Sequence, residues 1–272
     1  MDTVNASLNY LEDRDQRPYS YTYRPPDGLE AQRGRYAKFT VPIHDGRAIL
    51  KQISLDREGV ILTHQESRVE NFYDADEVRR VYYPEVERLV KAATGAIKVH
   101  VFDHNVRNRA MSEAGEKGIQ GPVKVAHNDY TVKSGPQRVR DLLPDEADEL
   151  LKHRFAVINV WRPIRGPVYE NPLAVCDAQT IAMDDLVCND LIYRDRVGEV
   201  YVLAYNPQHR WFYFPRMDKN EVMLLKCYDS DARRARFTAH SAFDDPSSPP
   251  DAPARESIEV RTLAFFAEPR EA

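Results

Sequence analysis

Apolar and polar residues alternate in many short runs along this chain, above all in its second half. A period of two residues is typical of β-strands with one buried face, because successive side chains of a strand point to opposite sides. The runs are rich in aromatic and β-branched residues, and turn-forming residues separate them. We predict strands at residues 36–43, 59–63, 97–102, 123–131, 155–161, 199–205, 211–215, 221–228, 236–240 and 257–266.

One long segment follows the helical period of 3.6 residues instead. Residues 74–94 place apolar side chains on a single stripe, with Asp74 or Asp76 positioned to cap the start. Gly95 is positioned to end the helix, and Pro84 is expected to kink it.

A shorter helix is predicted for residues 141–153, with Pro144 in its first turn. Many short strands with few helices favour a mainly β fold with flanking helices. In this fold two sheets close into a double-stranded β-helix, the jelly roll of cupin-like proteins.

The two ends of the chain differ from its middle. Residues 1–35 are polar and contain several prolines, so they predict an N-terminal arm, and the tyrosines in it favour packing over the body. Residues 36–272 are expected to form a single domain. Residues 244–253 contain four prolines and predict an irregular loop. We expect this loop and the arm to be mobile covers of a functional site.

Composition excludes several classes of protein. The chain has 272 residues, 42% hydrophobic and 30% charged, as in globular proteins, and a net charge of −5 offers no general attraction to nucleic acid or membranes. Three dispersed cysteines are too few for a disulfide framework. Residues 1–10 lack the features of a signal peptide, and no run is apolar enough to span a bilayer, so a cytoplasmic location is expected.

The run at residues 123–131 ends with a histidine and a carboxylate two residues apart, His127 and Asp129. On a strand these side chains point to one side while Asn128 points away. A third ligand from elsewhere would complete a face of two histidines and one carboxylate. Such a face holds ferrous iron and leaves other positions open for substrate and oxygen.

His240 is the histidine that best completes this set. It is followed by Arg255 and Ser257, which share one face of the last predicted strand. An arginine placed there can grip a carboxylate cosubstrate through its two-pronged donor geometry. The main rival is His209, which we expect to be exposed at the tip of a hairpin.

Two assignments stay open at this point. His100 and His104 flank a strand end and would serve as ligands only if the ligand strand were placed differently. Arg261 lies on the same face as Arg255 and is the alternative residue to hold the cosubstrate carboxylate. It would not be free for this role if it pairs with Glu259. A bulge in the strand would change the face that Arg261 occupies.

The order His-x-Asp, distal histidine, Arg-x-Ser resembles the pattern of iron(II) and 2-oxoglutarate dependent oxygenases. More specifically, the chain is similar to the fungal gibberellin desaturase and aspergillic acid hydroxylase-like family of secondary metabolism. The resemblance spans roughly residues 35 to 267. The segments that carry it, besides the His-x-Asp run, are residues 159–164, 172–178, 206–211 and 255–261.

The resemblance implies a non-haem dioxygenase that uses Fe(II), 2-oxoglutarate and O2. His127, Asp129 and His240 would be the metal ligands, and Arg255 and Ser257 would hold the cosubstrate. The partner would be a small, mostly apolar natural product, hydroxylated or desaturated at a C–H position. The sequence does not choose between the two outcomes.

Three further side chains are candidates for contact with substrate: Arg162, Tyr205 and Lys226. Each has a structural alternative, as a salt-bridge partner, a core aromatic and a snorkelling lysine respectively.

Two other functions stay open, a catalytically inactive cupin-like protein that binds a small molecule or a metal, and a cosubstrate-free iron dioxygenase in which Arg255 binds substrate. The complete Arg-x-Ser after the distal histidine favours the oxygenase over both. No nucleophile elbow, Walker loop or dinucleotide fingerprint supports a hydrolase or a nucleotide enzyme.

Overall fold

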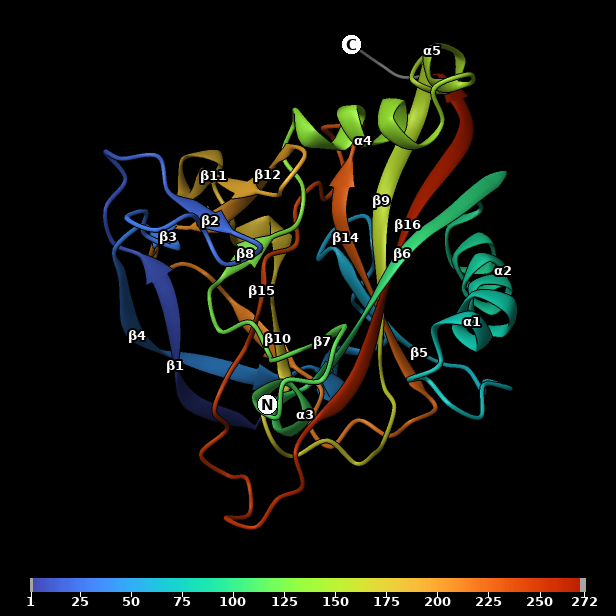
Figure 1. The fold of residues 1–272 in the computed structure, drawn as a ribbon. Coiled ribbons are helices and arrows are strands. Elements are labelled where there is room, and N and C mark those ends of the chain that lie inside the picture. The colour runs from blue at the N-terminus through green and yellow to red at the C-terminus, as the bar shows by residue number, and fades with distance from the viewer. Residues whose placement is uncertain (1, 270–272) are drawn as a thin grey trace.

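In the computed structural model, which describes residues 2–269, two β-sheets face each other and helices flank them (Figure 1). The larger sheet has ten strands in the order β1-β4-β13-β10-β15-β8-β12-β11-β2-β3, and the smaller has six in the order β5-β14-β9-β16-β6-β7. The predicted mainly β fold with flanking helices is confirmed.

The strands are β1 (Thr3–Leu11), β2 (Tyr19–Tyr21), β3 (Gln32–Arg33), β4 (Tyr36–Asp45), β5 (Val60–His64), β6 (Lys98–Asn108), β7 (Ile119–Gln120), β8 (His127–Asn128), β9 (His153–Pro163), β10 (Leu173–Cys176), β11 (Leu186–Ile192), β12 (Val197–Leu203), β13 (Trp211–Tyr213), β14 (Glu221–Asp229), β15 (His240–Ala242) and β16 (Glu256–Pro269). The α-helices are α1 (Ala75–Glu77), α2 (Tyr83–Thr94), α3 (Arg109–Glu113), α4 (Ser134–Leu142) and α5 (Ala147–Leu150). Single 3-10 turns lie at Gly46–Ile49, Ala178–Thr180 and Met183–Asp185, and a π-helical turn at Val78–Tyr82.

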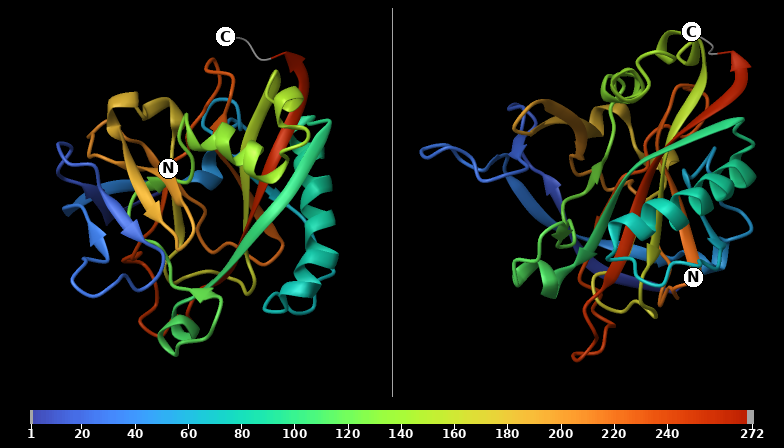
Figure 2. Two further views of the ribbon diagram at one scale, coloured as in Figure 1. Left: turned by 45° about the horizontal axis from the view of Figure 1, so that its top comes forward. Right: turned by 45° about the vertical axis from the view of Figure 1, so that its right-hand side comes forward.

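Three apolar layers hold these elements together. The layer between the sheets contains Trp161 of β9 and Phe212 of β13. A second layer lies under α2, which covers the outer face of the six-stranded sheet (Figure 2). A third lies on the other face of the ten-stranded sheet, around Tyr10 and Trp211. Strand β9 alternates between the first two layers, so its odd-numbered residues from 155 to 161 face the interior.

The long helix forms where the sequence predicts it, with one local change. Asp74 accepts hydrogen bonds from two backbone N–H groups at the start, and Gly95 ends the helix with a φ of 75°. The π-helical turn precedes Pro84 directly. Proline has no N–H to donate to the preceding turn, which accounts for the wider turn at this place.

The shorter helix was predicted at the wrong place. Helix α4 begins at Ser134 and ends at Leu142, before Pro144, and α5 starts only at Ala147. Pro144 separates two helices and does not open one, because proline disfavours helical backbone in the residue before it.

The strands that carry the candidate ligands are shorter than predicted. The run at residues 123–131 forms a ladder only at β8, and the run at residues 236–240 joins β15 only at its last residue. The two short strands lie next to each other in the ten-stranded sheet, with His127 paired opposite His240.

Residues 2–35, the described part of the predicted arm, contribute strands to the body of the protein. Strand β1 pairs with β4 along its whole length, and β2 pairs in parallel with β11. The segment therefore belongs to the ten-stranded sheet. The sequence of the segment did not predict these pairings, because the partner strands β4 and β11 are separated from β1 and β2 along the chain.

No helix in the described part of the chain has the length and apolar character needed to cross a membrane.

A glycine controls how closely the six-stranded sheet approaches the start of β15. Gly59 has a φ of +80°, and its carbonyl oxygen accepts a hydrogen bond from Thr238 Oγ1 at 3.1 Å. A Cβ at Gly59 would lie 2.0 Å from that hydroxyl oxygen. Thr238 in turn precedes the candidate ligand His240 by two residues.

We predict that Gly59→Ala lowers the free energy of unfolding by about 3 kcal/mol, part from the left-handed backbone and part from overpacking. The matched control is Gly28→Ala, because Gly28 has a φ of +87° but no described atom within 4 Å of an added Cβ. The control should lose about 1 kcal/mol. Denaturant unfolding of both variants tests this, and equal losses would contradict the proposed contact.

Candidate active site

His127, Asp129 and His240 come together between the two sheets. Their potential ligand atoms all lie within 4.8 Å of one another, and the two imidazole ring centroids are 4.5 Å apart. His127 Nε2 lies 3.6 Å from Asp129 Oδ1. His240 is buried and the other two side chains are largely buried. Two imidazoles and one carboxylate at these distances from one another form a face that could hold a transition metal.

Both imidazoles are oriented by backbone carbonyl groups. His127 Nδ1 lies 2.7 Å from the carbonyl oxygen of Val125, and His240 Nδ1 lies 3.1 Å from that of Thr238. A carbonyl only accepts, so each Nδ1 carries a proton, and Nε2 is the ring nitrogen that can offer a lone pair to a metal. Burial, and then the nearby His240, lower the pKa of His127 to about 4. The His127 ring is therefore neutral at neutral pH, as a metal ligand must be.

The carboxylate of Asp129 is held through one oxygen only. Its Oδ2 accepts hydrogen bonds from Asn159 Nδ2 at 2.8 Å and Arg261 Nε at 3.1 Å, while Oδ1 faces His127. Burial alone would raise the pKa of Asp129, but Arg261 and the two histidines outweigh burial and hold the pKa well below its usual range. One ionised oxygen is thus left for a cation.

Asn128, between the candidate ligands His127 and Asp129 in the sequence, holds this segment in place through hydrogen bonds. Its side-chain amide donates to the carbonyl oxygens of Tyr130 at 2.7 Å and Cys227 at 2.8 Å, and it accepts from the Thr238 backbone N–H at 3.1 Å. Strand β14 bulges at Cys227, since the pairing with β9 shifts between Lys226 and Tyr228. Asn128 therefore connects both ligand segments to the opposite sheet. Sequence reasoning noted only that it points away from the metal.

Arg255 and Ser257 lie at the start of β16 with unsatisfied polar atoms. Arg255 Nε and Ser257 Oγ are both buried and have no hydrogen-bond partner among residues 2–269. The guanidinium lies 5.6 Å from the ring centroid of Trp161 and donates to the carbonyl oxygen of Asn171. Burial and the nearby Arg107 lower the pKa of Arg255 to about 9, so it stays charged at neutral pH. Buried donors of this kind need a partner, and a carboxylate suits them.

Arg261 is already occupied by carboxylates. Besides Asp129, it donates to Glu259 at 2.9 Å and Asp103 at 3.2 Å. The predicted pair with Glu259 is thus present. A bulge does occur beside Arg261, but the extra residue is Phe102 on the neighbouring strand β6, so the face of residues 255–261 is unchanged toward β9. Of the two arginines, Arg255 has the free donor.

A cavity of about 690 Å³ opens over the ligands and is lined by His127, Asp129 and Arg261. Its wall is more polar than the mostly apolar substrate of the sequence analysis suggests. The cationic residues that line it are Arg17, Arg107, Lys133, Arg138, Arg196 and Arg261. The N-terminal segment contributes Arg17, Ser20, Thr22 and Gln32. Among the described residues, none of 244–253 lines this cavity, which argues against that loop as its cover.

The structure does not bring the three candidate substrate residues to this cavity. Arg162 faces the outer layer, where its guanidinium lies 5.5 Å from the ring centroids of Phe72 and Tyr82. Tyr205 stacks on Phe39, with ring centroids 4.0 Å apart, in the third apolar layer.

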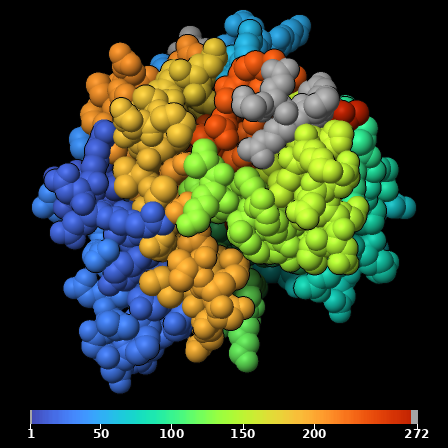
Figure 3. Space-filling view, turned by 90° about the horizontal axis from the view of Figure 1, so that it is seen from above, coloured from blue at the N-terminus to red at the C-terminus, as the bar shows by residue number. Residues whose placement is uncertain are grey.

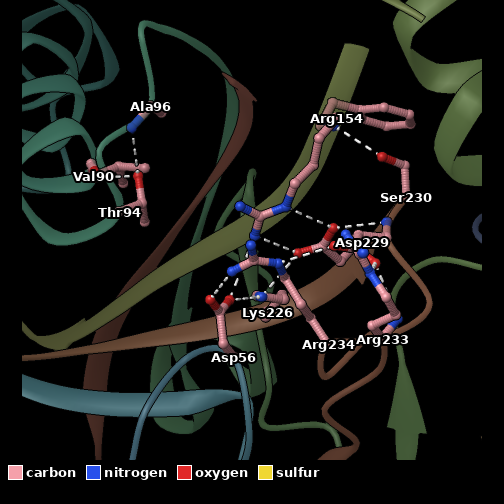
Figure 4. Close-up of polar contacts among 12 residues, drawn as sticks. Asp56, Val90, Thr94, Ala96, Arg154, Lys226, Asp229, Ser230, Arg233 and Arg234 are labelled. Atoms are coloured by element: carbon pink, nitrogen blue, oxygen red, sulfur yellow. Dashed lines mark hydrogen bonds and ion pairs between the residues drawn. The ribbon is translucent and has the colours of Figure 1, made fainter. Parts of the chain in front are cut away.

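Lys226 belongs to an ion-pair cluster with Asp56, Arg154 and Asp229, in which its Nζ contacts carboxylate oxygens at 2.5 and 2.8 Å (Figure 4). The bulge at Cys227 and the long sequence separation of Asp56 explain why the sequence could not reveal this cluster.

The rival histidines lie elsewhere. His209 is buried, not exposed as predicted: Nε2 lies 3.1 Å from Asp185 Oδ2, and the ring stacks on Tyr10. His104 contacts Tyr83 under helix α2, and neither it nor His100 lines the described cavity.

A jelly roll whose interior presents two histidines and a carboxylate defines a class, that of the non-haem iron oxygenases. Known proteins agree with this class. Residues 8–265 match the family model described as YDMC, Oxidoreductase/YMDC permease-like domain. The hydroxylase/desaturase efuI of Hormonema carpetanum is 32% identical, over 97% of this chain and 95% of that protein.

The Fe(II)/2-oxoglutarate-dependent dioxygenase nvfI of Aspergillus novofumigatus is 34% identical over 90% of both chains. The solved structure of the iron and alpha-ketoglutarate-dependent endoperoxidase NvfI superposes with a TM-score of 0.88, at 29% identity, over 97% of this chain and 98% of that one. The chain belongs to this family of fungal Fe(II)/2-oxoglutarate-dependent dioxygenases, which includes hydroxylases, desaturases and endoperoxidases. The cofactor of the family is Fe(II), and its cosubstrates are 2-oxoglutarate and O2.

We predict that His127→Ala, Asp129→Ala and His240→Ala each abolish tight Fe(II) binding, because two ligands of this face hold iron poorly. The matched control is His209→Ala, which removes another histidine beside a carboxylate and should leave iron binding unchanged. Anaerobic equilibrium dialysis against Fe(II) measures the effect, with circular dichroism to verify the fold. Retention of iron by the His240 variant together with its loss in the His209 variant would reverse the assignment.

Proposed function

We propose that this protein is an Fe(II)/2-oxoglutarate-dependent oxygenase that hydroxylates or desaturates a C–H position of a small natural product. The observation that carries the proposal is the combination of two sites in one interior: a metal-binding face made by His127, Asp129 and His240, and unpaired buried donors on Arg255 and Ser257. A binding protein without turnover has no need of the second site.

In this proposal each ligand has one defined atom. His127 and His240 would bind through Nε2, because their Nδ1 protons are engaged with carbonyl groups, and Asp129 would bind through Oδ1. Bound iron would supply the oxidative chemistry, in which 2-oxoglutarate and O2 yield succinate, carbon dioxide and an oxidised substrate. Arg261 and Asn159 keep the Asp129 carboxylate ionised and correctly turned.

The spacing of the two sites suits the cosubstrate. The guanidinium of Arg255 lies over Trp161, and Trp161 is two residues along β9 from Asn159, which holds Asp129. Two residues of a strand span about 7 Å. A five-carbon dicarboxylate is about this long, so one end would reach the metal-binding face while the other would meet Arg255 and Ser257.

The cavity of about 690 Å³ would hold the prime substrate, since volumes of this size are typical of small-molecule sites. The outcome, an alcohol or an alkene, depends on which C–H bonds the wall presents to the oxidant. Within the family we propose that the chain belongs with the gibberellin desaturase and aspergillic acid hydroxylase-like members, on the motifs at residues 159–164, 206–211 and 255–261.

Two alternative functions make different predictions. A cosubstrate-free iron dioxygenase would use Arg255 for its substrate and form no succinate, and a cupin-like binding protein would show no turnover. Succinate formed from Fe(II), 2-oxoglutarate and oxygen, even without a prime substrate, would exclude both.

We predict that Arg255→Ala weakens 2-oxoglutarate binding about 100-fold, because loss of a bidentate charge-assisted pair costs roughly 3 kcal/mol. Ser257→Ala should weaken it about 5-fold. Anaerobic titration of the Fe(II) protein with 2-oxoglutarate provides the dissociation constants. Arg261→Ala serves as the comparison, and we expect it to weaken iron binding first, because Arg261 holds Asp129. If Arg261→Ala weakens 2-oxoglutarate binding more than Arg255→Ala does, Arg261 and not Arg255 holds the cosubstrate carboxylate.

The loop between β2 and β3 is the proposed cover, since Thr22 and Gln32 at its two ends line the cavity. We predict that shortening residues 23–30 to two glycines reduces the succinate formed before the enzyme inactivates, because a less enclosed oxidant attacks the protein and solvent. Shortening residues 246–251 is the control and should change nothing. Equal succinate yields in both variants and the wild type would show that neither loop is a cover.

A further inference from the structure

Two of the six cationic residues on the cavity wall, Arg17 and Arg261, are neutralised by carboxylates of the protein itself. Arg17 pairs with Asp190 and Glu199, each at 2.5 Å. Arg261 pairs with Asp129 and Glu259, as described above. Arg17 and Arg261 therefore form structural ion pairs, and their charge is already compensated before a ligand binds. Arg107 donates to Gln120 and to the carbonyl oxygen of Gly121, and Lys133 and Arg196 are exposed.

Arg138 differs from these residues. It lies on α4, is half-buried and lines the cavity, yet it forms no ion pair and no hydrogen bond with any residue that the structure describes. Asp141, one turn further along α4, also lines the cavity, but its carboxylate accepts a hydrogen bond from Gln137 at 2.8 Å. The helix thus presents a guanidinium that its own acid does not neutralise.

The Arg138 guanidinium is nevertheless held in place. Its central carbon lies 5.0 Å from the ring centroid of Phe102. Phe102 is the extra residue of the bulge in β6, opposite Arg261 and Thr262 of β16. Bulges beside active sites commonly redirect a side chain, and here the ring becomes a platform for the cation. A ring orients a guanidinium but leaves its N–H groups unsatisfied, so they remain available.

The position of Arg138 separates it from the cosubstrate site. Arg255 lies at the start of β16, beside β6 at Arg107 and Asn108, whereas Phe102 lies beyond Arg261 toward the other end of both strands. Seen from above, α4 lies beside the hairpin of β11 and β12 (Figure 3). Arg138 therefore lines the cavity beyond Arg261, on the side away from Arg255.

We propose that the prime substrate carries a carboxylate and that Arg138 binds this group on the side of the cavity away from Arg255, which orients the substrate over the metal-binding face. This inference rests on the proposed function and names its substrate class. Arginine matches a carboxylate through two parallel N–H donors, so one contact fixes both position and orientation. The apolar part of the substrate would lie against the valines of the wall, Val123, Val125, Val197, Val200 and Val202.

The test uses a matched pair of probes, 1-naphthoate and 1-naphthamide, which differ in charge but hardly in shape. The protein is loaded with Mn(II) in place of Fe(II) and with saturating 2-oxoglutarate, so no turnover occurs. The relaxation of the naphthyl protons then reports binding close to the metal. We expect naphthoate to bind at least 10-fold more tightly than naphthamide.

The variants assign the preference to one residue. Arg138→Gln should bring the two affinities within 2-fold of each other, and Arg138→Lys should retain part of the preference. The control is Arg140→Gln, because Arg140 is exposed on the same helix and does not line the cavity. It should keep the full preference. Thermal melting verifies that all variants are folded.

Equal affinities of the wild type for both probes, or a preference that survives in Arg138→Gln, would overturn this inference. Both results leave the proposed function intact as long as Mn(II) and 2-oxoglutarate still bind the wild type. Loss of that binding in the wild type would instead refute the proposed function.

Discussion

The buried carboxylate of Asp129 is the constraint around which the rest of the site is arranged. An ionised carboxylate away from water costs several kcal/mol unless charges and hydrogen bonds compensate it. Here Arg261 and Asn159 hold one oxygen, and the other is left facing His127. Arg261 and Asn159 lie on neighbouring strands of one sheet, whereas Asp129 directly follows a strand of the other. The same contacts that keep the carboxyl charged therefore also fix how the two sheets meet.

A second set of contacts secures the ligand strands from behind. The side chains of residues 127, 128 and 129 alternate in direction, so that Asn128 turns to the opposite sheet while His127 and Asp129 face the candidate metal-binding point. The Asn128 amide bonds to Cys227 and to the backbone of Thr238, and the Thr238 carbonyl group orients His240. A site built on such short strands is rigid because each strand is held on both faces. Gly59 permits the closest of these approaches.

The parts of the site that depend on local geometry could be predicted from the sequence. Alternation along a strand was enough to pair His127 with Asp129. The same rule separates Arg162 from Trp161 on β9, and applying it would have removed Arg162 from the substrate candidates. Contacts between segments far apart in the chain could not be predicted. They include the pairing of β1 with β4, the ion-pair cluster around Lys226, and the bulge that places Phe102 under Arg138.

We propose that Asp129, held by Arg261, and two backbone-oriented histidines create one iron site with the cosubstrate beside it. An anaerobic crystal structure with Fe(II) and 2-oxoglutarate, with anomalous data collected at the iron edge, tests this most directly. We expect a single strong anomalous peak bounded by Nε2 of His127, Nε2 of His240 and Oδ1 of Asp129. We also expect a carboxylate of 2-oxoglutarate against Arg255 and Ser257. Iron bound elsewhere, or a cosubstrate carboxylate paired with Arg261 while Asp129 has turned away, would contradict this proposal.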